Sequence, residues 1–313
     1  VIMAHKIPDP DAIGAAVGLY RLGLSLGRKA HIVMNEVTIS VRAMVDELNK
    51  SGIYDEDMFI DNEQAIEITD ENTLLIVVDV NHANYTECEQ LLSQTKTTVI
   101  LDHHRKNKDM IKNPVLSYVE PYASSTCELV AEILQYVDSK PKLEPMEANA
   151  MYYGMLVDTD NFVNKTGVRT FEAASYLRRL GLNTADVKKL FNVNKEDYDH
   201  RADIVKTSKI IVSQIAVAKC YTKYPNIRVI ASQAADEMLN IGDIRASIVV
   251  YAQDGGVGIS ARSLGDINVQ LIMEYLGGGG HSTVAGAQVK DKNVDMVIED
   301  VEKAVFDYVA NNE

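Results

Sequence analysis

Several apolar segments of this chain are each followed by side chains that bind metal ions or transfer protons. In the clearest case, Asp102-His103-His104 comes at the end of the apolar run at residues 97–101. Three further segments follow the same pattern, ending at His5, Asp79 and Asp158. In an open parallel sheet such ends converge on one crevice, where ligands bind. The sequence therefore predicts a metal-dependent hydrolase.

Length and charge limit the classes of protein that this chain can belong to. Its 313 residues are enough for two domains with cores of their own. The net charge of −14 argues against broad binding of duplex nucleic acid, which needs a cationic face. A small anionic substrate held by metal ions remains compatible with it. The 3 scattered cysteines predict neither a disulfide framework nor a zinc knuckle.

The start of the chain is unusual. Residues 1–4 have the character of the last half of a buried strand, without upstream residues to begin it. No apolar stretch approaches the roughly 18 residues that span a bilayer, and the sequence has no signal peptide. The half strand at residues 1–4 leads us to expect that the chain is a fragment of a longer protein.

The first half of the chain alternates short segments rich in Val and Ile with longer helical patterns, as in βαβ units. Strands are expected at residues 1–4, 30–34, 73–80, 97–102 and 115–120. Apolar residues at three- and four-residue spacing predict helices at 12–26, 39–50, 85–93, 124–137 and 144–157. The expected fold class is α/β, with a parallel sheet in the N-terminal domain.

The second half begins with an almost continuous helical pattern at residues 169–212, broken near Gly181 and at residues 192–194. Strands are then expected at 215–221, 227–231, 246–252 and 257–261, with a hairpin turn at residues 254–256 and a last helix at about 293–310. We therefore divide the chain into a catalytic domain at residues 1–190, a helical linker at 191–214 and a smaller α/β domain at 215–313.

Prolines shape the first motif, because Asp9 and Asp11 each follow one. Residues before proline favour extended backbone, and at a period of two both carboxylates project to the same side, where His5 can join them. The alternative is that Asp11 is only the N-cap of the helix that begins at residue 12.

The later motifs also have alternatives. Asp79 follows a run apolar enough to be buried on both faces, where a bare carboxylate is costly, but it could simply cap a loop. His103 and His104 are adjacent and cannot both face one point from a regular strand, so one is expected to be a ligand and the other to be aimed elsewhere. Asp158 could be only a charge at a helix end.

Charge balance favours metal ions in this crevice. The carboxylates of Asp9, Asp11, Asp79 and Asp158 would repel one another in a low-dielectric pocket unless cations offset them, and two divalent ions would balance the four charges. The mixture of imidazoles and carboxylates, without thiolates, favours manganese over iron, cobalt or zinc, and the histidines disfavour magnesium. Two such ions can activate water and stabilise an in-line displacement at phosphorus.

The four motifs and a late glycine-rich run together resemble the DHH phosphoesterase family, in the subgroup with a DHH-associated domain at the C-terminus. The resemblance covers essentially the whole chain. The first two motifs, residues 5–14 and 78–81, are most similar to those of bacterial cyclic-di-AMP phosphodiesterases of the GdpP (YybT) type. Those are membrane proteins with upstream sensory domains, which would account for the unusual start.

The resemblance also implies roles for the site residues. It implies that one manganese ion is held by His5, Asp9 and Asp79. It implies that a second is held by Asp11, Asp79, His103 and Asp158, so that Asp79 bridges the two. Asp102 would orient the histidines, since a ligating imidazole needs its other nitrogen held. His104 would contact the phosphate or protonate the leaving oxygen.

The glycine-rich run at residues 277–280 follows an apolar helical pattern and precedes His281 and a further helical stretch. Its backbone amides could approach a phosphate closely, although glycine runs are often flexible connectors. Arg262 ends an expected strand and is suited to a two-pronged contact with phosphate oxygens. Family likeness supports a substrate clamp made of Arg262, Gly278, Gly279, Gly280 and His281. Ser124-Ser125 is expected to be a helix N-cap rather than a phosphate contact.

The expected function is hydrolysis of cyclic-di-AMP to linear pApA by a two-manganese phosphodiesterase. The main alternative is an oligoribonuclease of the same family that acts on short RNA, pApA or pAp, and the metal motif does not separate the two. A pyrophosphatase and a nucleotide sensor without turnover are further alternatives. The expected partner is a cyclic dinucleotide. The chain would be the cytoplasmic catalytic portion of a membrane-anchored bacterial protein, and a homodimer is left open.

Overall fold

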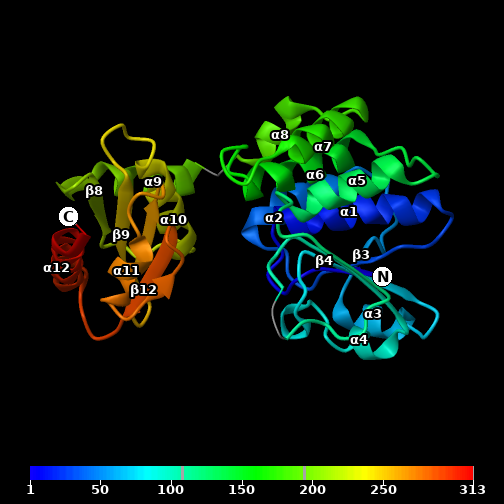
Figure 1. Ribbon diagram of the computed structural model, residues 1–313, viewed down its shortest axis with the longest axis horizontal. Helices are drawn as coiled ribbons and strands as arrows, with labels where there is room; N and C mark the ends of the chain where they lie inside the picture. Colours follow the sequence, from blue (N-terminus) through cyan, green and yellow to red (C-terminus); the bar gives the residue numbers. More distant parts are fainter. Residues whose placement is uncertain (107–108, 193–194, 313) are drawn as a thin grey trace. The chain divides into compact units, whose positions relative to one another are not determined.

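The computed structural model describes residues 1–106, 109–192 and 195–312 of the chain. The backbone divides into two compact units, residues 1–192 and 193–313, each built around its own six-stranded sheet (Figure 1). The predicted α/β fold class is therefore confirmed. The predicted break at residues 192–194 includes residues 193 and 194, which lie outside the described part.

The sheet of the first unit is parallel throughout, in the strand order β3-β2-β1-β4-β5-β6. Its strands are β1 (Ile2–Met3), β2 (Ile32–Val33), β3 (Phe59–Ile60), β4 (Leu74–Val78), β5 (Thr97–Asp102) and β6 (Leu116–Val119). The sequence predicted each of these strands except β3. The chain order reverses between β1 and β4, which makes their carboxyl ends the expected place for a ligand.

Side chains of each strand alternate between two cores, one on each face of this sheet. Ile2 and Val78 pack with the helices of one face, whereas Met3 and Val77 pack with those of the other. Helices α3 (Asn62–Ile68) and α4 (Leu91–Gln94) lie across the sheet from the larger helical layer (Figure 1). The larger layer consists of α1 (Pro10–Ser25), α2 (Ile39–Lys50), α5 (Thr126–Tyr136), α6 (Pro145–Asp158), α7 (Val168–Arg179) and α8 (Thr184–Leu190).

The helix predicted at residues 85–93 is wrong. The segment contains the end of a short 3-10 turn (Ala83–Tyr85) and the start of α4 (Leu91–Gln94), while α3 (Asn62–Ile68) was not predicted. Contacts with a segment distant in sequence explain the absence of this helix. Thr86 pairs with His5 in an isolated β-bridge, and the backbone N–H of Glu87 donates to the carbonyl of Ala4 at 2.8 Å. These contacts hold the segment against the end of β1, where it cannot form a helix.

The sheet of the second unit has the order β11-β12-β10-β9-β8-β7 and is antiparallel except for the β8–β9 pair. Its strands are β7 (Lys209–Val212), β8 (Ile215–Cys220), β9 (Ala246–Gln253), β10 (Gly256–Ser263), β11 (Gly279–Gly280) and β12 (Val284–Val289). Helices α9 (Lys195–Lys206) and α10 (Ile227–Met238) share one core of this unit, and α11 (Val269–Glu274) and α12 (Val294–Asn312) share the other. The predicted hairpin at residues 254–256 is confirmed.

Three predictions for the second half need correction. Residues 227–231 begin helix α10 rather than forming a strand, because the buried residues recur at helical spacing through residue 238. The stretch after the glycine run forms strand β12 rather than a helix, since it pairs with β10. In the described part of the linker that was predicted to be helical at 191–214, α9 is the helix, and β7 is a strand that pairs with β8.

Candidate metal centre

The predicted metal ligands of the first unit gather at the carboxyl ends of β1, β4 and β5. His5 follows β1, Asp79 follows β4, and Asp102 ends β5. Helices complete the group, because Asp11 lies in the first turn of α1 and Asp158 is the last residue of α6. The site therefore lies where the strand order reverses, as expected for a sheet of this kind.

Asp79 is the centre of the group. Its side chain is only 2% exposed, and its backbone has φ of 58°, a left-handed conformation that turns the chain sharply at the end of β4. One carboxylate oxygen, Oδ2, lies 3.4 Å from His5 Nε2, and the other, Oδ1, lies 3.4 Å from His103 Nε2. The hydroxyl of Thr126 donates to Oδ1 at 2.9 Å. The two oxygens of Asp79 thus face two different groups of side chains.

On the first side, His5 Nε2 lies 3.7 Å from Asp9 Oδ2. Asp9, not Asp11, is the N-cap of α1, and its Oδ1 accepts a hydrogen bond from the backbone N–H of Ala12 at 3.0 Å. The prediction that both carboxylates project from extended backbone is wrong, because the helix begins at Pro10, as proline at a first helical position favours. Capping leaves the second oxygen of Asp9 directed at His5.

On the second side, Asp11, His103 and Asp158 come together. His103 Nε2 lies 3.0 Å from Asp158 Oδ2 and 3.9 Å from Asp11 Oδ2. Asp11 is completely buried, and its carboxylate accepts backbone N–H groups from Thr126 at 2.6 Å and Cys127 at 2.8 Å. These amides belong to the first turn of α5, where the helix dipole also favours negative charge.

The two adjacent histidines approach the same carboxylate, contrary to the prediction from regular strand alternation. His104 Nδ1 lies 3.6 Å from Asp79 Oδ1, the oxygen that His103 also approaches, and the two ring centres are 4.5 Å apart. The reason is that β5 ends at Asp102, so the alternation does not continue through the histidines. Asp102 Oδ1 lies 2.8 Å from His104 Nδ1 and accepts the backbone N–H of His104 at 3.0 Å. Asp102 therefore positions His104.

The buried charges of the site perturb one another. Burial opposes ionisation of Asp79, but contacts with His103 and His5 hold its pKa below the usual range. Burial also opposes protonation of these two imidazoles, yet their carboxylate neighbours raise the pKa of His5 to about 10 and that of His103 to about 11. Burial and the charges of Asp79 and Asp158 raise the pKa of Asp11 well above its usual range. Without a metal ion, protons balance these carboxylates.

Three sets of side chains bring their ligand atoms within 4.8 Å of one another: His5, Asp9 and Asp79; Asp79, His103 and His104; and Asp11, His103 and Asp158. Both ring nitrogens of His103 are buried without a hydrogen-bond partner among the described residues. A buried imidazole nitrogen that faces carboxylates and lacks a hydrogen bond suits a cation between them. The donor set of imidazole and carboxylate therefore fits a divalent transition metal such as manganese.

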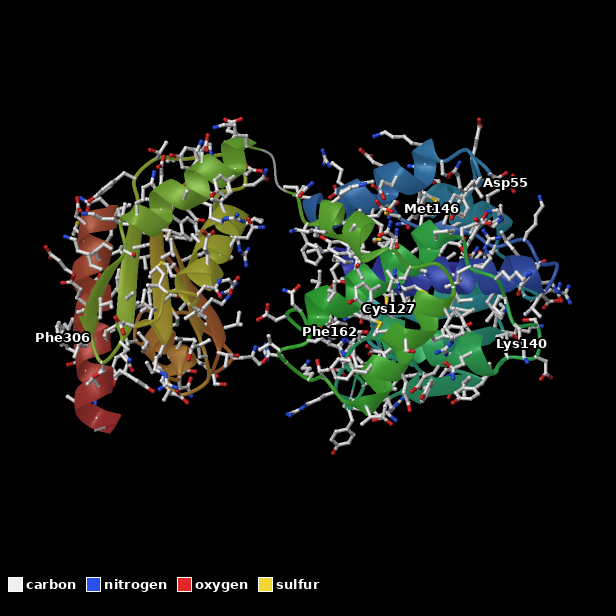
Figure 2. All side chains as sticks on the ribbon, turned by 90° about the horizontal axis from the view of Figure 1, so that it is seen from above. Asp55, Cys127, Lys140, Met146, Phe162 and Phe306 are labelled. Carbon is white, nitrogen blue, oxygen red and sulfur yellow. The ribbon has the colours of Figure 1, made fainter. Side chains whose placement is uncertain are left out.

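Sequence reasoning missed the residues that support this group from α5 and α6. Thr126 and Cys127 together donate to both Asp11 and Asp79. Figure 2 shows Cys127 inside the first unit, where its thiol donates to the carbonyl of Asp11 at 3.3 Å. A Cβ atom on Gly154 of α6 would lie 2.8 Å from Asp11 Cα, so the close packing of α1 and α6 at this point requires glycine. The Ser-Ser-Thr-Cys sequence at residues 124–127 could have indicated these donors, because it marks the start of a helix. The prediction of an N-cap at Ser124-Ser125 is confirmed, since Ser125 is the N-cap of α5.

The second unit holds the predicted substrate residues around a cavity of about 490 Å³, which lies wholly within that unit. Arg262, Gly278, Gly279, Gly280 and His281 all line it. The glycine run is not a loose connector, because Gly279–Gly280 forms β11 and a Cβ atom on Gly278 would collide with the carbonyl of Gly286. Arg262 Nε lies 2.8 Å from Asp236 Oδ1.

Among the helices that the structure describes, none combines the length and apolar character that a membrane span requires.

Residues 1–155 match the model of the DHH family, N-terminal domain, and residues 208–307 match the DHHA1 domain. The "Cyclic-di-AMP phosphodiesterase GdpP" of Geobacillus thermodenitrificans is 42% identical over 98% of this chain and 47% of its own length. The chain thus spans about half the length of that relative. The "Bifunctional oligoribonuclease and PAP phosphatase NrnA" of Mycoplasma genitalium is 28% identical over 98% of this chain and 94% of its own.

Among solved structures, an exopolyphosphatase-related protein from Bacteroides fragilis has a TM-score of 0.81 at 21% identity, over 98% of this chain and 91% of that one. This likeness supports the fold alone. The two domain matches and the identity to relatives lead to one assignment: the chain belongs to the DHH family, with a DHH N-terminal domain followed by a DHHA1 domain.

Proposed function

We propose that this chain hydrolyses cyclic-di-AMP to linear pApA and that it does so with two manganese ions. The observation that carries the proposal is the position of Asp79, whose two carboxylate oxygens face separate groups of ligand side chains. A carboxylate shared in this way suits a pair of ions, and pairs of divalent ions are used for displacement at phosphorus. The named activity of the GdpP relative supports the choice of substrate.

In this proposal His5, Asp9 and Asp79 hold one ion, and Asp11, Asp79, His103 and Asp158 hold the other. Four of these ligands are carboxylates, and their four negative charges match the charge of two divalent cations. When bound, the ions lower the pKa of a water molecule and offset negative charge on the phosphate. The proteins that bind such ions keep their ligands oriented by neighbouring hydrogen bonds, a role that falls here to the first turn of α5.

Hydrolysis adds a water oxygen to phosphorus, breaks the bond from phosphorus to the ribose 3′-oxygen, and transfers a proton to that oxygen. We assign the proton transfer, or a contact to the phosphate, to His104. Its side chain is 58% exposed, and Asp102 occupies Nδ1, which leaves Nε2 to face substrate. The hydrogen bond with Asp102 raises the pKa of His104, so that the imidazole holds a proton to donate.

We further propose that the cavity of the second unit binds substrate phosphate through Arg262, His281 and the glycine run. The family likeness also leads us to propose that this is the cytoplasmic catalytic portion of a membrane-anchored protein. A homodimer is compatible with the proposal and is not required by it.

The decisive experiment compares cyclic-di-AMP, cyclic-di-GMP, pApA, pAp and a short RNA under identical conditions with manganese. Chromatography should detect conversion of cyclic-di-AMP to pApA, with AMP appearing slowly. Magnesium alone should support little activity, because it prefers oxygen ligands to imidazoles. The Asp79→Asn protein, purified in the same way, controls for contaminating nucleases.

The alternative function is that of an oligoribonuclease acting on short RNA, pApA or pAp. It is favoured by the match to the NrnA relative, which extends over 94% of that protein. If short RNA or pApA is consumed much faster than cyclic-di-AMP, this function replaces the first proposal. The metal centre would be the same in both.

A further inference from the structure

The cavity of the second unit contains a second arginine that sequence analysis did not single out. Arg228 lines the cavity together with Arg262, and the hydroxyl-bearing residues Ser232, Tyr251 and Ser260 line it as well. Two guanidinium groups beside hydroxyls and exposed backbone are the chemistry of a phosphate-binding site. The positions and partners of the two arginines indicate whether they bind the same phosphate.

Helix α10 sets the positions of the charged residues along the cavity. Arg228, Ser232 and Asp236 follow one another at four-residue spacing, so they share one face of the helix. Arg228 and Asp236 are eight residues apart, a rise of about 12 Å along the helix axis. Two turns of α10 therefore separate the Cα atoms of Arg228 and Asp236.

The two arginines differ in their partners. Arg262 is only 16% exposed, its Nε lies 2.8 Å from Asp236 Oδ1, and its Nη1 donates to the carbonyl of Ala261 at 3.0 Å. Its guanidinium is thus fixed at the Asp236 end of α10. Arg228 is exposed, and the described residues offer it no carboxylate within the 4.0 Å of an ion pair. Arg228 is therefore a cation at the cavity whose charge no described ion pair offsets.

We propose that Arg228 binds a phosphate group of the substrate that is distinct from the phosphate bound at Arg262. The cavity would then be adapted to a ligand with two phosphates, one towards each end of α10, and would bind a mononucleotide less well. This inference rests on the proposed function, since it assumes that the cavity receives the dinucleotide. Asp236 would lower the affinity of Arg262 for phosphate, because the Asp236 carboxylate competes with phosphate for the same guanidinium.

The test is a titration of the manganese-loaded chain with a phosphorothioate analogue of cyclic-di-AMP, which resists hydrolysis, and separately with AMP. Arg228→Gln should weaken binding of the analogue about ten- to a hundredfold, as expected for loss of a charge-assisted hydrogen bond. Binding of AMP should change little, because the Arg262 end remains. Asp236→Asn should strengthen binding of both ligands.

Arg245→Gln is the matched control, because it removes an arginine of the same unit that pairs with Asp266 and does not line the cavity. It should leave both affinities unchanged. Wild-type affinity of Arg228→Gln for the analogue would overturn the proposal, as would an equal loss of AMP binding or failure of the wild-type chain to bind the analogue. Failure of the proposed function would be visible separately, as absence of cyclic-di-AMP hydrolysis by the wild-type chain.

Discussion

Thr126 connects the two carboxylates at the centre of the candidate metal site, and its hydroxyl can be removed without changing its shape. The hydroxyl donates to Asp79 Oδ1 at 2.9 Å, and the backbone N–H donates to Asp11 Oδ2 at 2.6 Å. Thr126→Val keeps the backbone donor and the branched side chain. Since the residue is completely buried, water does not easily replace the lost hydroxyl.

The expected magnitude follows from the charge of the acceptor. A hydrogen bond to a charged group contributes about 1.5–3 kcal/mol, which corresponds to roughly ten- to over a hundredfold in an equilibrium constant. Loss of a group that orients a metal ligand typically costs about 10- to 100-fold in metal affinity or activity. We therefore expect the manganese dissociation constant of Thr126→Val to rise by about one to two orders of magnitude.

Manganese binding can be followed by the magnetic resonance signal of free Mn²⁺ during titration of the metal-free chain. Thr126→Ser keeps the hydroxyl and should bind manganese nearly as well as the wild type. Thr170→Val is the matched control for stability, because the buried hydroxyl of Thr170 donates to the carboxylate of Glu128 at 2.7 Å, outside the proposed ligand set. It should lower the melting temperature without changing manganese affinity.

Two results would refute the reasoning. Unchanged manganese affinity in Thr126→Val would mean that the hydroxyl does not hold Asp79 for a metal ion. An equal loss of affinity in Thr170→Val would mean that metal binding merely follows the stability of the first unit.

Four further predictions follow from the same geometry. Asp79→Asn should lose most bound manganese and turnover while keeping its circular dichroism spectrum; two retained ions by elemental analysis would contradict the bridging role. Arg262→Ala should keep its metal content but lose about ten- to a hundredfold in kcat/KM, and wild-type kinetics would exclude it from substrate binding. Gly154→Ala should lower the free energy of unfolding by about 1–3 kcal/mol in urea titrations, because its new Cβ atom would lie 2.8 Å from Asp11 Cα; unaltered stability would be the contrary result. Manganese affinity should rise with pH below the raised pKa values of the two site imidazoles, about 10 and about 11, because binding must displace their protons; calorimetry in buffers of different ionisation enthalpy should detect proton release, and its absence would count against imidazole ligation.

The sequence by itself determined most of the described strands of the first unit and the place of its site. Runs such as residues 74–78 are apolar enough for a strand buried on both faces, and polar residues directly after them must lie at the carboxyl edge of a parallel sheet. This information is local, because a few consecutive residues decide both the strand and its end. The hairpin at residues 254–256 could be predicted for the same reason.

Local pattern was misleading where contacts distant in sequence decide the conformation. Residues 227–231 are rich in Ile and Val, yet they begin α10, because their apolar side chains are buried at helical spacing against the second sheet. His103 and His104 approach one carboxylate since the strand ends before them. Neither outcome follows from strand periodicity.

Only the tertiary structure decided how the site is supported and which charges are already paired. Asp11 accepts its backbone donors from residues more than a hundred positions away, and the Arg262–Asp236 pair depends on α10 packing against the second sheet. Such contacts are set by how helices dock on a sheet, through packing and burial that no single segment encodes. The sequence thus determined which chemical groups the chain carries at its strand ends, whereas their hydrogen-bond partners, burial and charge balance arose only when distant segments packed together.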